Sequence, residues 1–120
     1  MKILVAEDDS LTRKVLQKTL HKAGFNVILA KNAKEAIAGF EQSKPEIILI
    51  DIYMPGMDGI KLIRLIRDLN INIPVAVITR DKSEEMVVKA FEAGADDFIL
   101  KPFDEQDLTE RLLKLRAKNE

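Results

Sequence analysis

The chain has 120 residues, a length that suits one domain built around one hydrophobic core. Its 19 lysine and arginine residues almost balance its 20 aspartate and glutamate residues, and the formal net charge of -1 excludes a bulk attraction to nucleic acid or to an anionic membrane. Cysteine is absent, which excludes disulfides and thiolate metal sites, and with no signal peptide and no apolar run of about 20 residues we expect a soluble cytoplasmic protein.

Short apolar runs alternate along the chain with longer segments of helical periodicity. The runs have the length and composition of buried strands, and they occupy residues 3–6, 27–30, 47–50, 75–78 and 98–100. Continuous apolar strands separated by helices are typical of a parallel sheet that is covered on both faces. The pattern therefore predicts an α/β fold of the (βα)5 type, in a single domain over residues 1–120.

The first predicted helix begins at Asp9 or Ser10 and stops at Gly24, which suits a helix C-cap. Three of its apolar residues are expected to face the core: Leu11, Val15 and Leu20. The second helix begins after Asn32, and Glu35 completes a capping box with that residue. Its inward-facing residues are predicted to be Ile37 and Phe40.

The last three predicted helices each follow a residue whose side chain can cap the helix N-terminus, namely Asp58, Ser83 and Asp104. Gly94 ends the fourth helix. Apolar residues recur at helical spacing in all three: Ile63 and Ile66 in the third, Val87, Ala90 and Phe91 in the fourth, and Leu108, Leu112 and Leu115 in the fifth.

Polar residues stand where four of the five apolar runs end. Glu7 and Asp8 follow the first run, Asp51 the third, Thr79 the fourth and Lys101 the fifth. If the runs are parallel strands, these residues converge on one edge of one sheet, and ligands of open α/β sheets bind beyond the carboxyl ends of the strands. The sequence therefore predicts a functional site at this edge.

Several carboxylates at one sheet edge repel one another unless a cation joins them. Their oxygen atoms suit a hard divalent ion such as Mg²⁺, which commonly shares a substrate phosphate with one or two carboxylates. Lys101 adds a fixed positive charge and Thr79 a hydroxyl donor, so the site could neutralise a phosphoryl group. Asp51 is then the natural nucleophile and would form an aspartyl phosphate.

Four segments of the chain, in order, resemble the receiver domain of two-component response regulators. They are K-I-L-V-A-E-D-D, D-I-Y-M-P-G-M-D-G, V-I-T and G-A-D-D-F-I-L-K-P-F, and the likeness spans all 120 residues. The resemblance implies a doubly wound, flavodoxin-like fold, with a five-stranded parallel sheet of order 2-1-3-4-5 flanked by five helices.

The resemblance also assigns roles to single residues. It implies that Asp51 is the phosphoacceptor and that Mg²⁺ (or Mn²⁺) is bound by Asp8, Asp51 and the main-chain carbonyl of Tyr53, with Glu7 reaching the ion through water. Thr79 and Lys101 would bind the phosphoryl group, Lys101-Pro102 would be a cis peptide, and Thr79 and Phe98 would form the switch.

In this family the phosphoryl group comes from the phosphohistidine of a sensor histidine kinase or a phosphotransfer protein. The resemblance therefore implies a signalling switch that catalyses its own phosphorylation and dephosphorylation, and that alters the surface of its fourth helix, fifth strand and fifth helix. The expected recipient is an effector protein or an output domain, with no nucleic acid bound by this chain. The chain is expected to be a monomer, with dimerisation through that surface as the alternative.

Four positions depart from the common pattern or tune it. Arg80 follows Thr79, where receivers usually carry a small residue, and it could narrow access to the acyl phosphate or pair with it. Tyr53 and Asp81 occupy positions that set phosphate lifetime in the family, where Tyr53 could shield the acyl phosphate and Asp81 could orient water. Phe98 replaces a frequent tyrosine, so any readout there relies on packing.

Two other functions fit less well. A haloacid-dehalogenase-type phosphatase also uses an aspartate nucleophile, Mg²⁺ and a lysine, but it carries a second aspartate where this chain has Tyr53. A nucleotide or flavin module is disfavoured because neither G-x-G-x-x-G nor G-x-x-x-x-G-K-[ST] occurs.

Overall fold

The computed structural model describes residues 1–54 and 58–118, in which five strands and five helices alternate. The strands are β1 (Lys2–Ala6), β2 (Asn26–Ala30), β3 (Ile47–Asp51), β4 (Val75–Thr79) and β5 (Asp97–Leu100). The helices are α1 (Ser10–Lys22), α2 (Ala33–Ser43), α3 (Gly59–Asp68), α4 (Glu84–Ala93) and α5 (Glu105–Lys118). The predicted (βα)5 pattern is confirmed.

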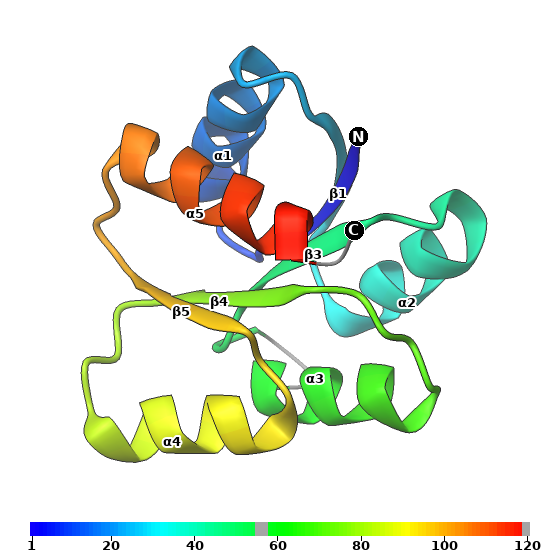
Figure 1. Ribbon diagram of the computed structural model, residues 1–120, viewed down its shortest axis with the longest axis vertical. Coiled ribbons are helices and arrows are strands. Elements are labelled where there is room, and N and C mark those ends of the chain that lie inside the picture. Colours follow the sequence, from blue (N-terminus) through cyan, green and yellow to red (C-terminus); the bar gives the residue numbers. More distant parts are fainter. Residues whose placement is uncertain (55–57, 119–120) are drawn as a thin grey trace.

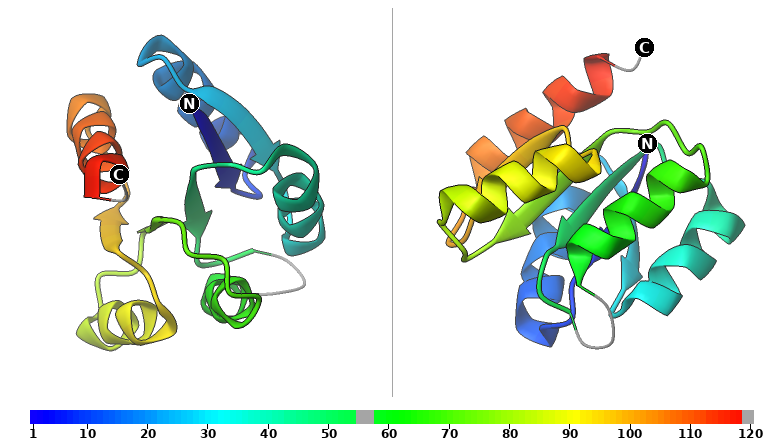
Figure 2. Two further views of the ribbon diagram at one scale, coloured as in Figure 1. Left: turned by 45° about the vertical axis from the view of Figure 1, so that its right-hand side comes forward. Right: turned by 90° about the horizontal axis from the view of Figure 1, so that it is seen from below.

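All the strands pair in parallel, in the order β2-β1-β3-β4-β5. This is the predicted doubly wound, flavodoxin-like topology. Helices α1 and α5 lie on one face of the sheet, and α2, α3 and α4 lie on the other (Figure 1). Seen from below in Figure 2, α3 and α4 lie in front of the strands, next to each other.

The sheet separates two hydrophobic cores. One core lies under α2, α3 and α4 and includes Leu4, Ile48 and Val77, and the other lies under α1 and α5 and includes Val5, Leu49 and Ile78. Side chains alternate between the two faces along a strand, so β3 and β4, which are buried along their whole length, must be apolar on both faces. This is why these strands read as continuous apolar runs.

The predicted helix caps are present. Asp9, Asn32, Asp58, Ser83 and Asp104 each accept a hydrogen bond from a backbone N–H in the first turn of the helix that follows. The carboxylate of Glu35 reaches back to the N–H of Lys31, 2.9 Å away. The Leu residues predicted to lie in the core from α5, namely Leu108, Leu112 and Leu115, are buried.

The predicted inward face of α1 is wrong for two of its three residues. Leu11 and Val15 are 71% and 38% exposed, whereas Leu16, Thr19 and Leu20 are buried. The buried stripe therefore runs one position later along the helix than the apolar spacing suggested. The helix begins at Ser10 and ends at Lys22, with Gly24 in the left-handed region at a φ of 96°.

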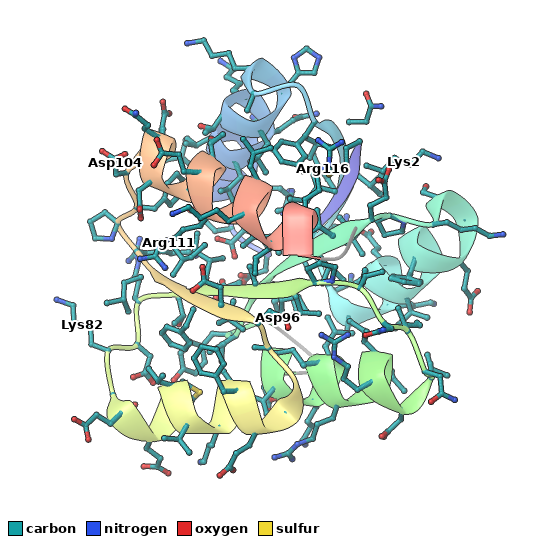
Figure 3. All side chains as sticks on the ribbon, in the orientation of Figure 1. Lys2, Lys82, Asp96, Asp104, Arg111 and Arg116 are labelled. Carbon is teal, nitrogen blue, oxygen red and sulfur yellow. The ribbon has the colours of Figure 1, made fainter. Side chains whose placement is uncertain are left out.

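The carboxyl ends of the strands face the same edge of the sheet. Lys82 and Asp104, which follow β4 and β5, mark that edge in Figure 3. No helix in the described ranges is long and apolar enough to cross a membrane.

Candidate functional site

The four strand ends bring together the residues that the sequence singled out. Glu7 follows β1 directly, Asp51 and Thr79 are the last residues of β3 and β4, and Lys101 follows β5. Glu7, Asp51 and Thr79 are buried, although all three are polar. Polar groups lose hydration when they are buried, so their burial at one edge indicates a site that is stabilised by mutual contacts or by a ligand.

Lys101 links the two buried carboxylates. Its ammonium nitrogen lies 2.5 Å from Oε1 of Glu7 and 3.3 Å from Oδ2 of Asp51. The lysine is brought from the far strand of the sheet by the β5–α5 loop, in which the peptide bond between Lys101 and Pro102 is cis, as predicted. The side chain of Lys101 is only 11% exposed, so its charge is aimed at the site and not at solvent.

Three carboxylates form a cluster that could hold a metal ion. One oxygen from each of Glu7, Asp8 and Asp51 lies within 4.8 Å of the others. Within the described residues, Oε2 of Glu7 is buried without a hydrogen-bond partner. An all-oxygen donor set with an unpartnered buried oxygen fits a hard divalent cation such as Mg²⁺.

The buried position of Glu7 changes its acidity. Burial raises the pKa of Glu7 from 4.5 to about 8, and the neighbouring Asp51 acts in the same direction, while Lys101 opposes them. The raised pKa means that Glu7 binds a proton more tightly than an ordinary glutamate does, and a bound cation would oppose that proton. A proton and a metal ion therefore compete for the carboxylate of Glu7.

Asp9 has a different role from Asp8. Its carboxylate accepts hydrogen bonds from the backbone N–H and the hydroxyl of Thr12, 2.8 Å and 2.6 Å away, and so caps α1. These bonds lower the pKa of Asp9, and the charges of Lys101 and Arg80 contribute smaller decreases. The carboxylate cluster contains Asp8 and not Asp9.

Tyr53 and Asp81, one on each side of the site, are joined by a hydrogen bond. The phenol hydroxyl of Tyr53 donates to Oδ2 of Asp81 over 2.6 Å, and the backbone N–H of Ser83 donates to Oδ1. The N–H of Asp81 in turn donates to the hydroxyl oxygen of Thr79, 3.2 Å away. The loops after β3 and β4 are thus linked across the edge of the sheet.

Asp51 opens onto a pocket of about 240 Å³. The pocket is lined by Asp9, Thr12, Asp51, Tyr53, Arg80 and Lys101. A larger groove of about 630 Å³ shares Thr12, Arg80 and Lys101 with it and is otherwise lined mainly by apolar residues: Leu11, Val15, Pro102 and Phe103, with Glu105. Phe98 is half-buried on the other face of the sheet, against the core under α2, α3 and α4.

Two residues that support the site were missed by sequence reasoning. Arg13, on α1, donates to the main-chain oxygens of Glu7 and Asp8, each 3.0 Å away, and so fixes the loop that carries the cluster. Gly59 packs so closely on the β3–α3 loop that a Cβ would lie 2.6 Å from the carbonyl oxygen of Asp51. Gly59 belongs to the D-I-Y-M-P-G-M-D-G segment and could have been found there, whereas nothing in the sequence marks Arg13.

Two parts of the predictions are not tested by this geometry. Residues 55–57 of the D-I-Y-M-P-G-M-D-G segment lie outside the described residues, as do residues 119 and 120 of the charged C-terminal segment. The predicted metal contact of the Tyr53 carbonyl and the switching role of Phe98 stay predictions.

Comparisons with known proteins agree with the fold. The family model of the response regulator receiver domain matches residues 3–113. The transcriptional regulatory protein PhoP of Escherichia coli K12 is 35% identical over 119 residues, which cover 99% of this chain and 53% of that protein. A cyclic di-GMP phosphodiesterase of Thermotoga maritima is 41% identical over 85% of this chain and 27% of its own length.

Solved structures give the same result. The receiver domain of the Francisella response regulator 1452 superposes with a TM-score of 0.94 at 31% identity, covering 99% of this chain and 98% of that one. The chain spans about half the length of the first curated relatives that it matches.

Proposed function

Given that this chain belongs to the response regulator receiver domain family, we propose that Asp51 accepts a phosphoryl group from the phosphohistidine of a sensor histidine kinase or a phosphotransfer protein. The observation that carries the proposal is the contact of the Lys101 ammonium with both Asp51 and Glu7. A second negative group on Asp51 would meet a positive charge that is already in place. We also propose that residues 1–120 act as one receiver domain in the cytoplasm, where response regulators are typically found.

In the transfer, an oxygen of the Asp51 carboxylate attacks phosphorus while the bond from phosphorus to the donor nitrogen breaks, and the departing imidazole keeps that electron pair. Lys101 and the hydroxyl of Thr79 hold phosphoryl oxygens and stabilise their charge. Mg²⁺ or Mn²⁺, held by Asp8, Asp51 and the main-chain carbonyl of Tyr53 and through water by Glu7, would supply further positive charge to the phosphoryl oxygens. The chain thus promotes its own phosphorylation and its own dephosphorylation.

Phosphorylation would act as a switch because the phosphoryl group and the N–H of Asp81 would compete for the hydroxyl group of Thr79. The hydroxyl oxygen of Thr79 now accepts a hydrogen bond from the N–H of Asp81, and a phosphoryl group on Asp51 would draw the hydroxyl away. The half-buried Phe98 would then repack in the space that Thr79 leaves. Driving a two-state equilibrium from 1:99 to 99:1 needs about 5.5 kcal/mol, which several charge-assisted contacts can supply together.

We propose that the surface of α4, β5 and α5 passes the signal to a partner. Exposed apolar side chains occur on each of these elements, including Phe91 on α4, Leu100 on β5 and Leu113 on α5. Arg111 on α5, which is labelled in Figure 3, is already paired with Asp97 on β5 and with Asp107, so a change in β5 would be passed to α5. An effector protein, an output domain or a second copy of this chain would read the change.

Intact mass measurement tests the proposal. Wild-type protein incubated with Mg²⁺ and acetyl phosphate should gain the mass of one phosphoryl group, which is lost again over time, whereas Asp51→Asn should gain none. The absence of an adduct in the wild-type protein would refute the proposal. Steady hydrolysis of many phosphoesters would instead support the phosphatase alternative.

A further inference from the structure

Arg80 is an exposed cation at the site. Lys101 contacts Glu7 and Asp51, and Arg13 donates to main-chain oxygens of Glu7 and Asp8. Within the described residues, the exposed guanidinium of Arg80 has neither a hydrogen-bond partner nor an ion-pair partner. Its five N–H donors are therefore available to an incoming anion.

The position of Arg80 places it on the way to Asp51. It follows Thr79 directly and lines both the 240 Å³ pocket over Asp51 and the adjoining 630 Å³ groove. A phosphorylated group that moves from the groove to the pocket therefore passes Arg80, together with Thr12 and Lys101, which also line both.

The positive charge of Arg80 would attract an anionic phosphoryl donor. A phosphoryl donor is an anion, and it must approach an edge where Asp8, Asp9 and Asp51 repel it. A cation at the entrance offsets this repulsion and raises the rate at which an anion is captured, and the effect falls as salt screens it.

We propose that Arg80 captures the anionic phosphoryl donor, pairing its guanidinium with phosphoryl oxygens before the group is transferred to Asp51. The proposal rests on the proposed function of Asp51 and adds a binding residue for the donor. The only bonds that change are the one that forms between the Asp51 oxygen and phosphorus and the one that breaks between phosphorus and the leaving group.

Three substitutions separate charge from size at this position. Arg80→Ala removes both, Arg80→Gln keeps much of the length without the charge, and Arg80→Lys keeps the charge. If Arg80 captures the donor, both Arg80→Ala and Arg80→Gln should lower the second-order rate constant for phosphorylation by acetyl phosphate by about three- to tenfold. The decrease should come from a higher KM for acetyl phosphate. Lys should stay within about twofold of wild type, and added salt should bring all the rates together.

Lys82 provides the matched control. It is an exposed cation in the same loop, and it is absent from the described lining of both pockets. Lys82→Gln changes the net charge as Arg80→Gln does, but its rate constant should stay within about twofold of wild type.

Three results would overturn the proposal. If Arg80 only narrows access, Arg80→Ala is faster than wild type and Arg80→Gln is unchanged. Equal rates in all variants, or an equal loss in Lys82→Gln, would show that the guanidinium does not contact the donor. In each of these cases Asp51 is still phosphorylated, whereas a wild-type protein without any adduct would refute the function of Asp51 and the role of Arg80 together.

Discussion

At the scale of single residues, the bond between Tyr53 and Asp81 determines what each can do. Sequence reasoning gave them opposing roles, with Tyr53 as a shield of the acyl phosphate and Asp81 as a group that orients water. In the structure both carboxylate oxygens of Asp81 accept hydrogen bonds, one from Tyr53 and one from Ser83. While this bond persists, Asp81 is engaged and the two roles cannot be varied independently.

Titration of the phenol tests this bond directly, because Tyr53 is the only tyrosine and the chain has no tryptophan. The hydrogen bond to Asp81 raises the pKa of Tyr53, since ionisation would break the bond and place a second negative charge beside the carboxylate. Asp81→Ala should lower the pKa towards the ordinary value near 10, measured by phenolate absorbance against pH. Asp68→Asn, a charge change on an exposed residue at the end of α3, should leave it unchanged.

Glu7 should make the metal-free protein less stable as pH rises. Its pKa is about 8 in the folded protein against 4.5 as the ordinary value, so the folded state holds the proton more tightly. The favourable contribution is fully present below pH 4.5 and is lost between there and about pH 8, at up to about 1.4 kcal/mol per pH unit. Urea unfolding with a chelator present should show wild type losing stability relative to Glu7→Gln across this window. A constant difference between the two proteins would contradict the prediction.

At the scale of elements, Arg67 joins three parts of the chain. Its guanidinium donates to the main-chain oxygens of Ile71, Ile73 and Gly94 and to the carboxylate of Asp96, with all five N–H donors in use. Asp96 also accepts from the N–H of Val75 at the start of β4. The end of α3, the start of β4 and the C-terminal end of α4 are therefore tied together.

Replacing Arg67 should cost stability even when the charge is kept. Lysine cannot reproduce a planar set of five donors, so Arg67→Lys leaves half-buried carbonyl oxygens without partners and should lower the free energy of unfolding by about 2–4 kcal/mol. Arg64→Lys, at an exposed position on the same helix, should change it by less than about 0.5 kcal/mol. Urea unfolding of both variants makes the comparison, and equal losses would show that the hydrogen bonds of Arg67 contribute nothing specific.

Helix boundaries were easier to predict than helix faces. The caps at Asn32, Asp58 and Ser83 could be read from the sequence because capping depends on a side chain and the N–H groups three residues away. The buried face of α1 could not be predicted in this way, because Leu11 and Leu16 are equally apolar. Leu16 is the one that packs in the core shared with α5. Leu11 instead lines the groove beside the site.

At the scale of the whole molecule, the sheet topology explains why the site was predictable and its details were not. Parallel strands in the order β2-β1-β3-β4-β5 end at one edge of the sheet, and this places Glu7, Asp51, Thr79 and Lys101 there. The Tyr53–Asp81 bond and the support from Arg13 depend on loop and helix side-chain conformations, and no pattern in the sequence determines these.

Mg²⁺ should stabilise the whole fold, because the cluster of Glu7, Asp8 and Asp51 is assembled only in the folded chain. At a concentration 100 times its dissociation constant, the ion should add about 2.7 kcal/mol to the free energy of unfolding. The gain should increase with pH up to about 8, since protonated Glu7 competes with the cation. Thermal unfolding with Mg²⁺, against K⁺ at equal ionic strength, measures the gain, and Asp8→Asn should reduce it strongly. A gain that K⁺ reproduces, or that survives in Asp8→Asn, would locate the effect outside the cluster.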